Sequence, residues 1–228
     1  MTGAETEATR QGCDKIRLYT NEVMTENFAY YAQPGYGART SGSGGPGMIK
    51  TERLLLRPLT SADTEALLEY RGREDVCRYV PFEPMTAEVI AHRLATQWAT
   101  TELTDEGQAL TLGAEITATG ELAGDVVLFW RSREHRGGEL GYVFNPRFAG
   151  QGYATEAAWA LLALAFDELG LHRVIARLDE RNEASAKVAR RLGMRLEARL
   201  VSNELFKGEW STELDFAILH EEWLSPGS

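Results

Sequence analysis

Two glycines directly before a long apolar segment are the feature that most constrains the fold of this chain. Gly150 and Gly152 precede a run rich in Ala, Leu and Phe, which predicts a helix over residues 153–169 that ends at Gly170. Because this helix is apolar nearly all round, we expect it to pack against a sheet. Its first turn has backbone N–H groups without intrahelical partners, and the helix dipole adds positive charge there. That position suits an anion such as phosphate.

The residues around these glycines sharpen the expectation. Arg147 lies just before them and adds a full positive charge, while glycine allows close backbone approach and positive φ angles. Two common phosphate-binding patterns are excluded by spacing, because no Lys follows Gly152 and Thr155 stands where the dinucleotide fingerprint needs Gly or Ala. Taken alone, the glycines are also compatible with a plain turn before a core helix.

Length and composition limit the class of protein. The chain has 228 residues, of which 43% are hydrophobic, enough for one large domain or for an ordinary domain with an appendage. Its formal net charge of −10 argues against a nucleic-acid partner and favours a cationic or amine-bearing substrate. Cys13, Cys77 and four scattered histidines lack zinc-site spacing, so we expect free thiols and no metal. Without a secretory signal or a bilayer-spanning apolar run, we expect a cytoplasmic protein with no membrane partner.

The order of periodic segments predicts a main domain of alternating helices and strands. Residues 1–47 end in a Gly/Ser-rich linker, so the domains are expected at 1–47 and 48–228. The expected strands are 53–59, 109–117, 121–131, 139–144, 173–178, 194–206 and 209–219, and the expected helices are 60–70, 86–100, 153–169 and a segment ending at 192. The strands on either side of helix 153–169 should lie near one another and parallel, with ligands at their carboxyl ends.

Four motifs in this order resemble the GNAT superfamily of acetyl-CoA-dependent N-acetyltransferases, and most closely its RimJ/RimL type, which acetylates protein N-terminal amines. The motifs are Thr51-Glu-Arg-Leu-Leu-Leu-Arg-Pro-Leu59, Glu139-Leu-Gly-Tyr142, Arg147-x-x-Gly-Gln-Gly-Tyr-Ala-Thr-Glu-Ala157, and Asn182-x-x-Ser185 followed by Leu192-Gly-Met194. The resemblance covers residues 48–224. It implies an α/β (α+β) GNAT fold, in which a mixed twisted sheet of about seven strands with flanking helices splays between strands 4 and 5. The pantetheine arm of coenzyme A would lie in that gap.

The resemblance also assigns roles to residues of this chain. A backbone N–H of Tyr142 or Val143 would stabilise the oxyanion, Ser185 would protonate the departing thiolate, and Glu139 would act as the base, directly or through a water. The loop 148–153 would bind the pyrophosphate. The implied cofactor-binding residues are Val143, Arg147, Phe148, Ala149, Gly150, Gln151, Gly152, Tyr153, Ala154, Asn182 and Ser185.

Several of these assignments have structural alternatives. Ser185 also fits a helix-start hydroxyl, Asn182 fits a helix N-cap, and Glu139 fits an exposed glutamate on a strand. Lys187 and Arg190 on the following helix are better explained by a solvated charged face than by contact with the adenosine phosphate.

Residues 1–37 have a resemblance of their own, to the tail of a second GNAT domain. Aligning Gly35 with Gly193 sets Met24 against Asn182 and Asn27 against Ser185. The glycine loop and long helix are missing there, so this piece is interpreted as a remnant without a cofactor site. Coincidence in a short tyrosine-rich segment is the alternative.

The function expected from the motifs is transfer of the acetyl group of acetyl-CoA to a primary amine, by direct attack in a ternary complex. The acceptor is a protein N-terminus or a small-molecule amine, and a homodimer is an expectation from the family alone. The alternative function is a non-catalytic acyl-CoA-binding regulatory module. A nucleotide-binding oxidoreductase is disfavoured, since the third glycine of its fingerprint is missing.

Overall fold

The computed structural model describes residues 47–224. The predictions for residues 1–46, which include the partial second domain and the linker, lie outside the described residues. Within 47–224, no helix has the length and apolar character needed to cross a membrane.

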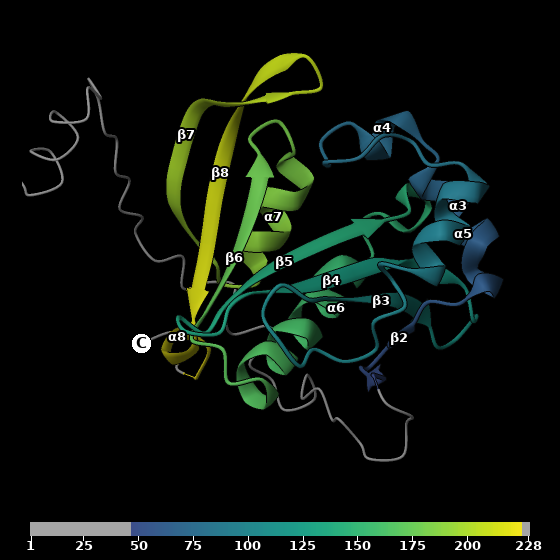
Figure 1. Ribbon diagram of the computed structural model, residues 1–228, viewed down its shortest axis with the longest axis horizontal. Coiled ribbons are helices and arrows are strands. Elements are labelled where there is room, and N and C mark those ends of the chain that lie inside the picture. Colours follow the sequence, from purple (N-terminus) through teal and green to yellow (C-terminus); the bar gives the residue numbers. More distant parts are fainter. Residues whose placement is uncertain (1–46, 225–228) are drawn as a thin grey trace, which may run out of the picture.

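An eight-stranded sheet with the order β1-β2-β3-β4-β5-β6-β8-β7 forms the centre of the fold (Figure 1). Its strands are β1 (Ile49–Lys50), β2 (Leu54–Pro58), β3 (Ala109–Ile116), β4 (Leu122–Ser132), β5 (Gly137–Phe144), β6 (Arg173–Asp179), β7 (Arg195–Phe206) and β8 (Glu209–Leu219). All neighbouring strands are antiparallel except β5 and β6, which are parallel. Seven strands correspond to the prediction, and the two-residue β1 adds an eighth at the edge.

The parallel pair β5–β6 separates soon after it begins. Only three residue pairs join the strands, from Gly137–Arg173 to Glu139–Ile175. Beyond them β5 continues to Phe144 and β6 to Asp179 in diverging directions, as Figure 1 shows. We call the pair Glu139–Ile175, where the strands part, the fork. The predicted splay is therefore confirmed.

Helices cover the two faces of the sheet unevenly. Their bounds are α3 (Thr64–Arg71), α4 (Glu74–Cys77), α5 (Ala87–Ala95), α6 (Tyr153–Ala163), α7 (Glu183–Arg191) and α8 (His220–Leu224), with short helical turns η1 (Ser61–Asp63), η2 (Pro146–Phe148) and η3 (Leu164–Glu168). The core around α6 and α7 contains Val126 and Leu128 of β4, whereas Asp125, the residue before Val126, accepts a hydrogen bond from Tyr70 of α3. Because side chains alternate along a strand, α3 lies on the face opposite α6 and α7.

Two apolar clusters fill these layers. The larger one joins the sheet to α6 and α7 and includes the fully buried Leu161, Phe166 and Phe216. The smaller one lies beneath α3 and α5 and is built around Tyr70 and Ile90. The long apolar helix thus packs against the sheet as predicted.

The structure differs from the predicted helices at four places. The segment 153–169 is α-helical only to Ala163 and continues as a π-helical turn, η3. The helix predicted over 86–100 ends at Ala95, because Thr96 leaves the helical conformation with φ −127° and ψ −89°. The short helices α4 and α8 have no counterpart among the predictions. Gly170 and Gly193 follow the helix ends with positive φ angles, as expected for Gly170 and for the Leu192-Gly turn.

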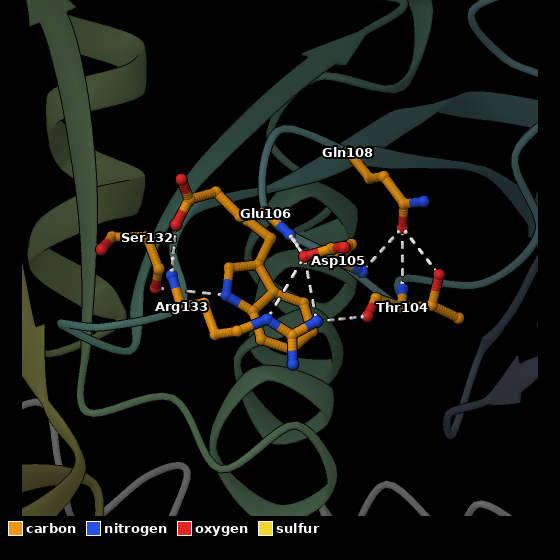
Figure 2. A network of polar contacts seen from close by, with 7 residues as sticks. Thr104, Asp105, Glu106, Gln108, Ser132 and Arg133 are labelled. Atoms are coloured by element: carbon orange, nitrogen blue, oxygen red, sulfur yellow. Dashed lines mark hydrogen bonds and ion pairs between the residues drawn. The ribbon is translucent and has the colours of Figure 1, made fainter.

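A polar network on the surface fixes the loop that enters β3 against the turn that leaves β4 (Figure 2). Gln108 Oε1 accepts hydrogen bonds from the backbone N and the hydroxyl of Thr104, and Arg133 donates to the Thr104 carbonyl and to Asp105. Both partners of the Arg133–Asp105 ion pair are more than half exposed. This network serves below as a solvent-exposed reference for a buried one.

Candidate functional site

The loop between β5 and α6 lies directly beyond the diverging end of β5. Gly150 and Gly152 have φ angles of +79° and +81°, and Gly152 is the N-cap residue of α6. An ideal Cβ on Gly150 would meet no atom within 4 Å, so the backbone there borders open space. Positive φ and open space in front of a helix N-terminus fit the binding of a phosphate group by backbone N–H groups.

The other residues of this loop take several positions. Ala149 precedes Gly150 in extended conformation, and Ala154 belongs to the first turn of α6. The rings of Phe148 and Tyr153 meet edge to face with centroids 6.4 Å apart. These two rings flank the glycine segment, so the loop is bounded on both sides by aromatic packing.

Arg147 is paired with protein carboxylates. Its guanidinium forms ion pairs with Glu121 and, at 3.7 Å, with Glu69, and it lies over the ring of Phe148. The Arg147 side chain is 52% exposed, so solvent weakens both pairs. The structure shows contacts that sequence reasoning did not foresee. Arg147 would have to exchange one of these carboxylates for an anionic ligand.

Tyr142 and α7 are joined across the diverging strands. The Tyr142 hydroxyl donates a hydrogen bond to the backbone carbonyl of Ser185 at 2.8 Å, and burial raises the pKa of Tyr142. At the start of α7, Asn182 Oδ1 accepts from the backbone N of Ser185 at 3.1 Å. Asn182 is therefore a helix N-cap in this structure. The side chain of Val143 is partly buried and packs against the smaller apolar cluster.

Glu139 stands at the fork and is held by two arginines. Its Oε2 accepts from Arg131 Nε at 2.8 Å and from Arg177 at 3.0 Å. Its side chain is 14% exposed, against 48% and 45% for the two arginines. Both contacts use Oε2, which leaves Oε1 without a hydrogen bond to residues 47–224. Glu139 is thus more enclosed than the exposed strand residue that was its alternative.

Sequence reasoning missed two carboxylates on β8 that share this face of the sheet. The register pairs Arg177 with Asp215 and Asp179 with Glu213. Burial raises the pKa of both Asp215 and Glu213, with Glu139 among the nearby negative charges that add to the effect. Asp215 Oδ1 is buried without a hydrogen-bond partner in residues 47–224. Glu213 and Asp215 are two residues apart, so the sequence alone places them on the same face of β8. Only the strand register shows that this is the face on which Arg177 lies.

Contacts from the β7–β8 hairpin cross over to the segment 77–83. Lys207 Nζ donates to the carbonyl oxygens of Cys77 and Phe82 at 2.7 and 2.8 Å. Arg181, just after β6, lies with its guanidinium 5.5 Å from the ring centroid of Tyr79. In Figure 1 the hairpin and the α4 region accordingly lie on either side of the end of β6. These two contacts connect the two parts of the fold beyond the fork.

Lys187 and Arg190 of α7 have protein partners. Lys187 pairs with Glu183 one turn earlier at 3.7 Å and is 65% exposed, whereas Arg190 lies over the ring of Phe216. No set of three or more His, Cys, Asp or Glu side chains is placed to hold a metal ion in the described part of the chain. Cys77 is a free, buried thiol that donates to the carbonyl of Arg71.

Comparisons with known proteins agree with this architecture. The uncharacterized N-acetyltransferase YnaD of Bacillus subtilis (strain 168) is 34% identical over 175 residues, which covers 77% of this chain and 98% of YnaD. The spermidine N(1)-acetyltransferase of Escherichia coli (strain K12) is 26% identical over 178 residues, covering 78% of this chain and 92% of that enzyme. The crystal structure of a GNAT-family acetyltransferase from Bacillus anthracis matches with a TM-score of 0.69 at 34% identity, covering 77% of this chain and 99% of that one.

The sequence profile of the family described as "Acetyltransferase (GNAT) domain" matches residues 53–195. This range contains the glycine loop, the fork and Ser185, and the mixed sheet with its flanking helices is the fold of that family. The fold and the class of enzyme expected from the sequence are confirmed. The chain belongs to the GNAT family of acetyl-CoA-dependent acetyltransferases.

Proposed function

We propose that this protein transfers the acetyl group of acetyl-CoA to a primary amine by direct attack within a ternary complex. The observation that carries the proposal is the fork together with the glycine loop. β5 and β6 part after three residue pairs, and the loop that follows β5 has two positive-φ glycines before α6. A long thiol-bearing arm fits between diverging strands, and its pyrophosphate fits the N–H groups ahead of the helix.

The residues around the fork supply the groups that acyl transfer needs. Beyond Glu139 the backbone of β5 is no longer paired with β6, so N–H groups of this stretch can face the reacting carbonyl. The donor from Tyr142 or Val143 would stabilise the oxyanion as the amine nitrogen bonds to the carbonyl carbon. Glu139 would accept the amine proton through a water on Oε1. Ser185 would give a proton to the sulfur as the carbon–sulfur bond breaks.

The acceptor we propose is a primary amine with further positive charge. The net charge of −10 and the carboxylates Glu139, Glu213 and Asp215 on one face of the sheet support this choice. A relative at 26% identity is named for acetylating spermidine, which is a cationic amine. Peptides that begin with Ala or Ser, the acceptors of the RimJ/RimL type, are the competing class.

The first experiment is titration with acetyl-CoA followed by a free-thiol release assay with spermidine, an aminoglycoside and Ala- or Ser-initiated peptides. We expect saturable binding and thiol release that requires an amine. Tight binding without release from any amine would support the non-catalytic acyl-CoA module instead. Failure to bind acetyl-CoA would refute the proposed function.

Two variants test the assigned residues. Ser185→Ala should lower turnover far more than it lowers acetyl-CoA affinity, and unchanged turnover would remove its role as proton donor. Gly150→Val should raise the dissociation constant for coenzyme A, because φ +79° is unfavourable for a β-branched residue. Gly107→Val is the matched control, since Gly107 has φ +84° and equally open space but lies in the loop before β3.

A further inference from the structure

An arginine from the start of the domain holds the glycine loop from behind. Glu156, in the first part of α6, is buried, with a side chain 2% exposed. Its Oε1 accepts from the Thr51 hydroxyl at 2.6 Å and from the backbone N of Arg53 at 2.8 Å. Its Oε2 accepts from Arg53 Nε at 2.7 Å and Nη2 at 2.6 Å. Two charge-assisted hydrogen bonds from one guanidinium to the same carboxylate oxygen hold both side chains in one geometry.

The same guanidinium also reaches the loop itself. Arg53 Nη1 donates to the carbonyl oxygen of Gln151 at 2.9 Å, and its carbon Cζ lies 4.9 Å from the ring centroid of Tyr153. Arg53 therefore contacts the residues on both sides of Gly152. An ideal Cβ on Gly152 would lie 3.5 Å from Arg53 Nη2, so the arginine packs closely behind this glycine.

The contact with Gln151 determines the direction of a backbone donor. A peptide unit is planar and trans, so the C=O of one residue and the N–H of the next point in opposite directions. Because the Gln151 carbonyl points to Arg53, the Gly152 N–H points away from it. Glycine backbones have many accessible conformations, so a loop with Gly150 and Gly152 needs an external contact to keep one of them.

We propose that Arg53 is a positioning residue for the donor pyrophosphate. It pins the Gln151 carbonyl and, through Glu156, the first turn of α6, and thereby aims the Gly152 N–H at the pyrophosphate. This inference rests on the proposed function, because it takes acetyl-CoA as the donor. It predicts that the loss of Arg53 affects only donors that carry a pyrophosphate.

The test compares three donors with the full-length chain: acetyl-CoA, acetyl-dephospho-CoA, which keeps the pyrophosphate but lacks the 3′-phosphate, and S-acetyl-pantetheine, which has neither. The variants are Arg53→Lys and the double variant Arg53→Met/Glu156→Gln. Lysine keeps the charge beside Glu156 but lacks the several N–H groups with which the guanidinium bonds to Glu156 and Gln151 together. The double variant avoids leaving a buried carboxylate without its partner.

We expect both variants to raise the dissociation constant for CoA and dephospho-CoA by about tenfold, the size of effect typical for one charge-assisted hydrogen bond. The kcat/KM with S-acetyl-pantetheine and the maximal rate at saturating acetyl-CoA should stay within about twofold of the values for the unmodified protein. This limit is well below the expected tenfold change in the dissociation constants. Arg57→Met is the control, because Arg57 on β2 pairs with Asp63 and Glu115 away from the loop. Arg57→Met should alter the stability of the protein but affect its activity with the three donors to the same extent.

Two results would overturn the role of Arg53 while leaving the proposed function intact. One is CoA binding by both variants as tight as that of the unmodified protein. The other is an equal loss with S-acetyl-pantetheine, which would show a general structural defect. If the unmodified protein itself did not bind CoA, the proposed function would fail first.

Discussion

The buried charge network between α3 and β4 gives the sharpest stability prediction. Asp125 is 1% exposed and Arg71 is 5% exposed, and the two form a bidentate pair. The Tyr70 hydroxyl donates to the same carboxylate, at Oδ2. The Arg71 guanidinium lies over the rings of Phe82 and Trp98, with centroids 4.8 and 4.9 Å from its Cζ. No water replaces a lost partner easily at such a site.

Asp125→Asn is the perturbation, because it keeps the shape and removes the charge. Arg71 donates to both carboxylate oxygens and Tyr70 to one of them, so the new amide NH2 faces a donor in either orientation. Breaking a buried pair from one side costs about 3–5 kcal/mol. For a protein of this size that corresponds to a fall in Tm of roughly 6–20 °C.

The assay is urea unfolding followed by tryptophan fluorescence, since Trp98 contacts Arg71 directly. Asp105→Asn is the exposed control, because the Arg133–Asp105 pair of Figure 2 lies in solvent and its loss should leave the midpoint unchanged. The double variant Arg71→Met/Asp125→Leu should be less destabilised than Asp125→Asn, as it leaves no unpaired charge. A loss below about 1 kcal/mol for Asp125→Asn would refute the reasoning, since that is the range of exposed pairs.

Three further predictions concern single residues. Burial raises the pKa of Asp215, so the folded state loses stability as pH rises through that raised pKa. Asp215→Asn should therefore raise the free energy of unfolding by about 1 kcal/mol at pH 7. Thermal melts should show this gain fading at about pH 4, and an undiminished gain there would contradict the prediction. Lys207→Met removes the donor to the Cys77 and Phe82 carbonyls, so amide exchange in 77–83 should accelerate and stability should fall by about 1–3 kcal/mol; unaltered exchange would show that the contact is dispensable. Gly193→Ala should cost about 1–2 kcal/mol in urea unfolding because φ is +77°, and a neutral result would mean that the turn relaxes.

Local patterns predicted the elements that depend on local physics. The positive φ angles of Gly150 and Gly152 follow from their place before a helix, and Gly170 ends the apolar segment as expected. The apolar pattern continues into this turn as far as Phe166, so nothing in it distinguishes a π-helical turn from an α-helix. The four-residue α4 escaped prediction because a distant contact holds it: Lys207 Nζ donates to the Cys77 carbonyl from 130 residues away.

The chemistry of the site was less predictable, because charges find partners through the register of strands. Glu139 was identified from its motif, but its two arginines come from β4 and β6, the second 38 residues away in sequence. Arg147 was expected to add a positive charge beside the glycines, and the fold brings Glu121 and Glu69 against it. Residue type and motif therefore identified the candidates, and the three-dimensional structure determined which of their charges are already neutralised.

Side-chain contacts hold the diverging strands both at the fork and farther from it. At the fork, the Arg177–Glu139 ion pair joins β6 to β5 where their pairing stops. Further out, the Tyr142 hydroxyl reaches the Ser185 carbonyl on α7, and Lys207 connects the hairpin to the segment 77–83. These contacts join β5 and the segment 77–83 on one side of the gap to β6, α7 and the β7–β8 hairpin on the other. The donor that we propose to bind between β5 and β6 would therefore meet strands whose separation is already set by side-chain contacts, which would lower the ordering cost of binding.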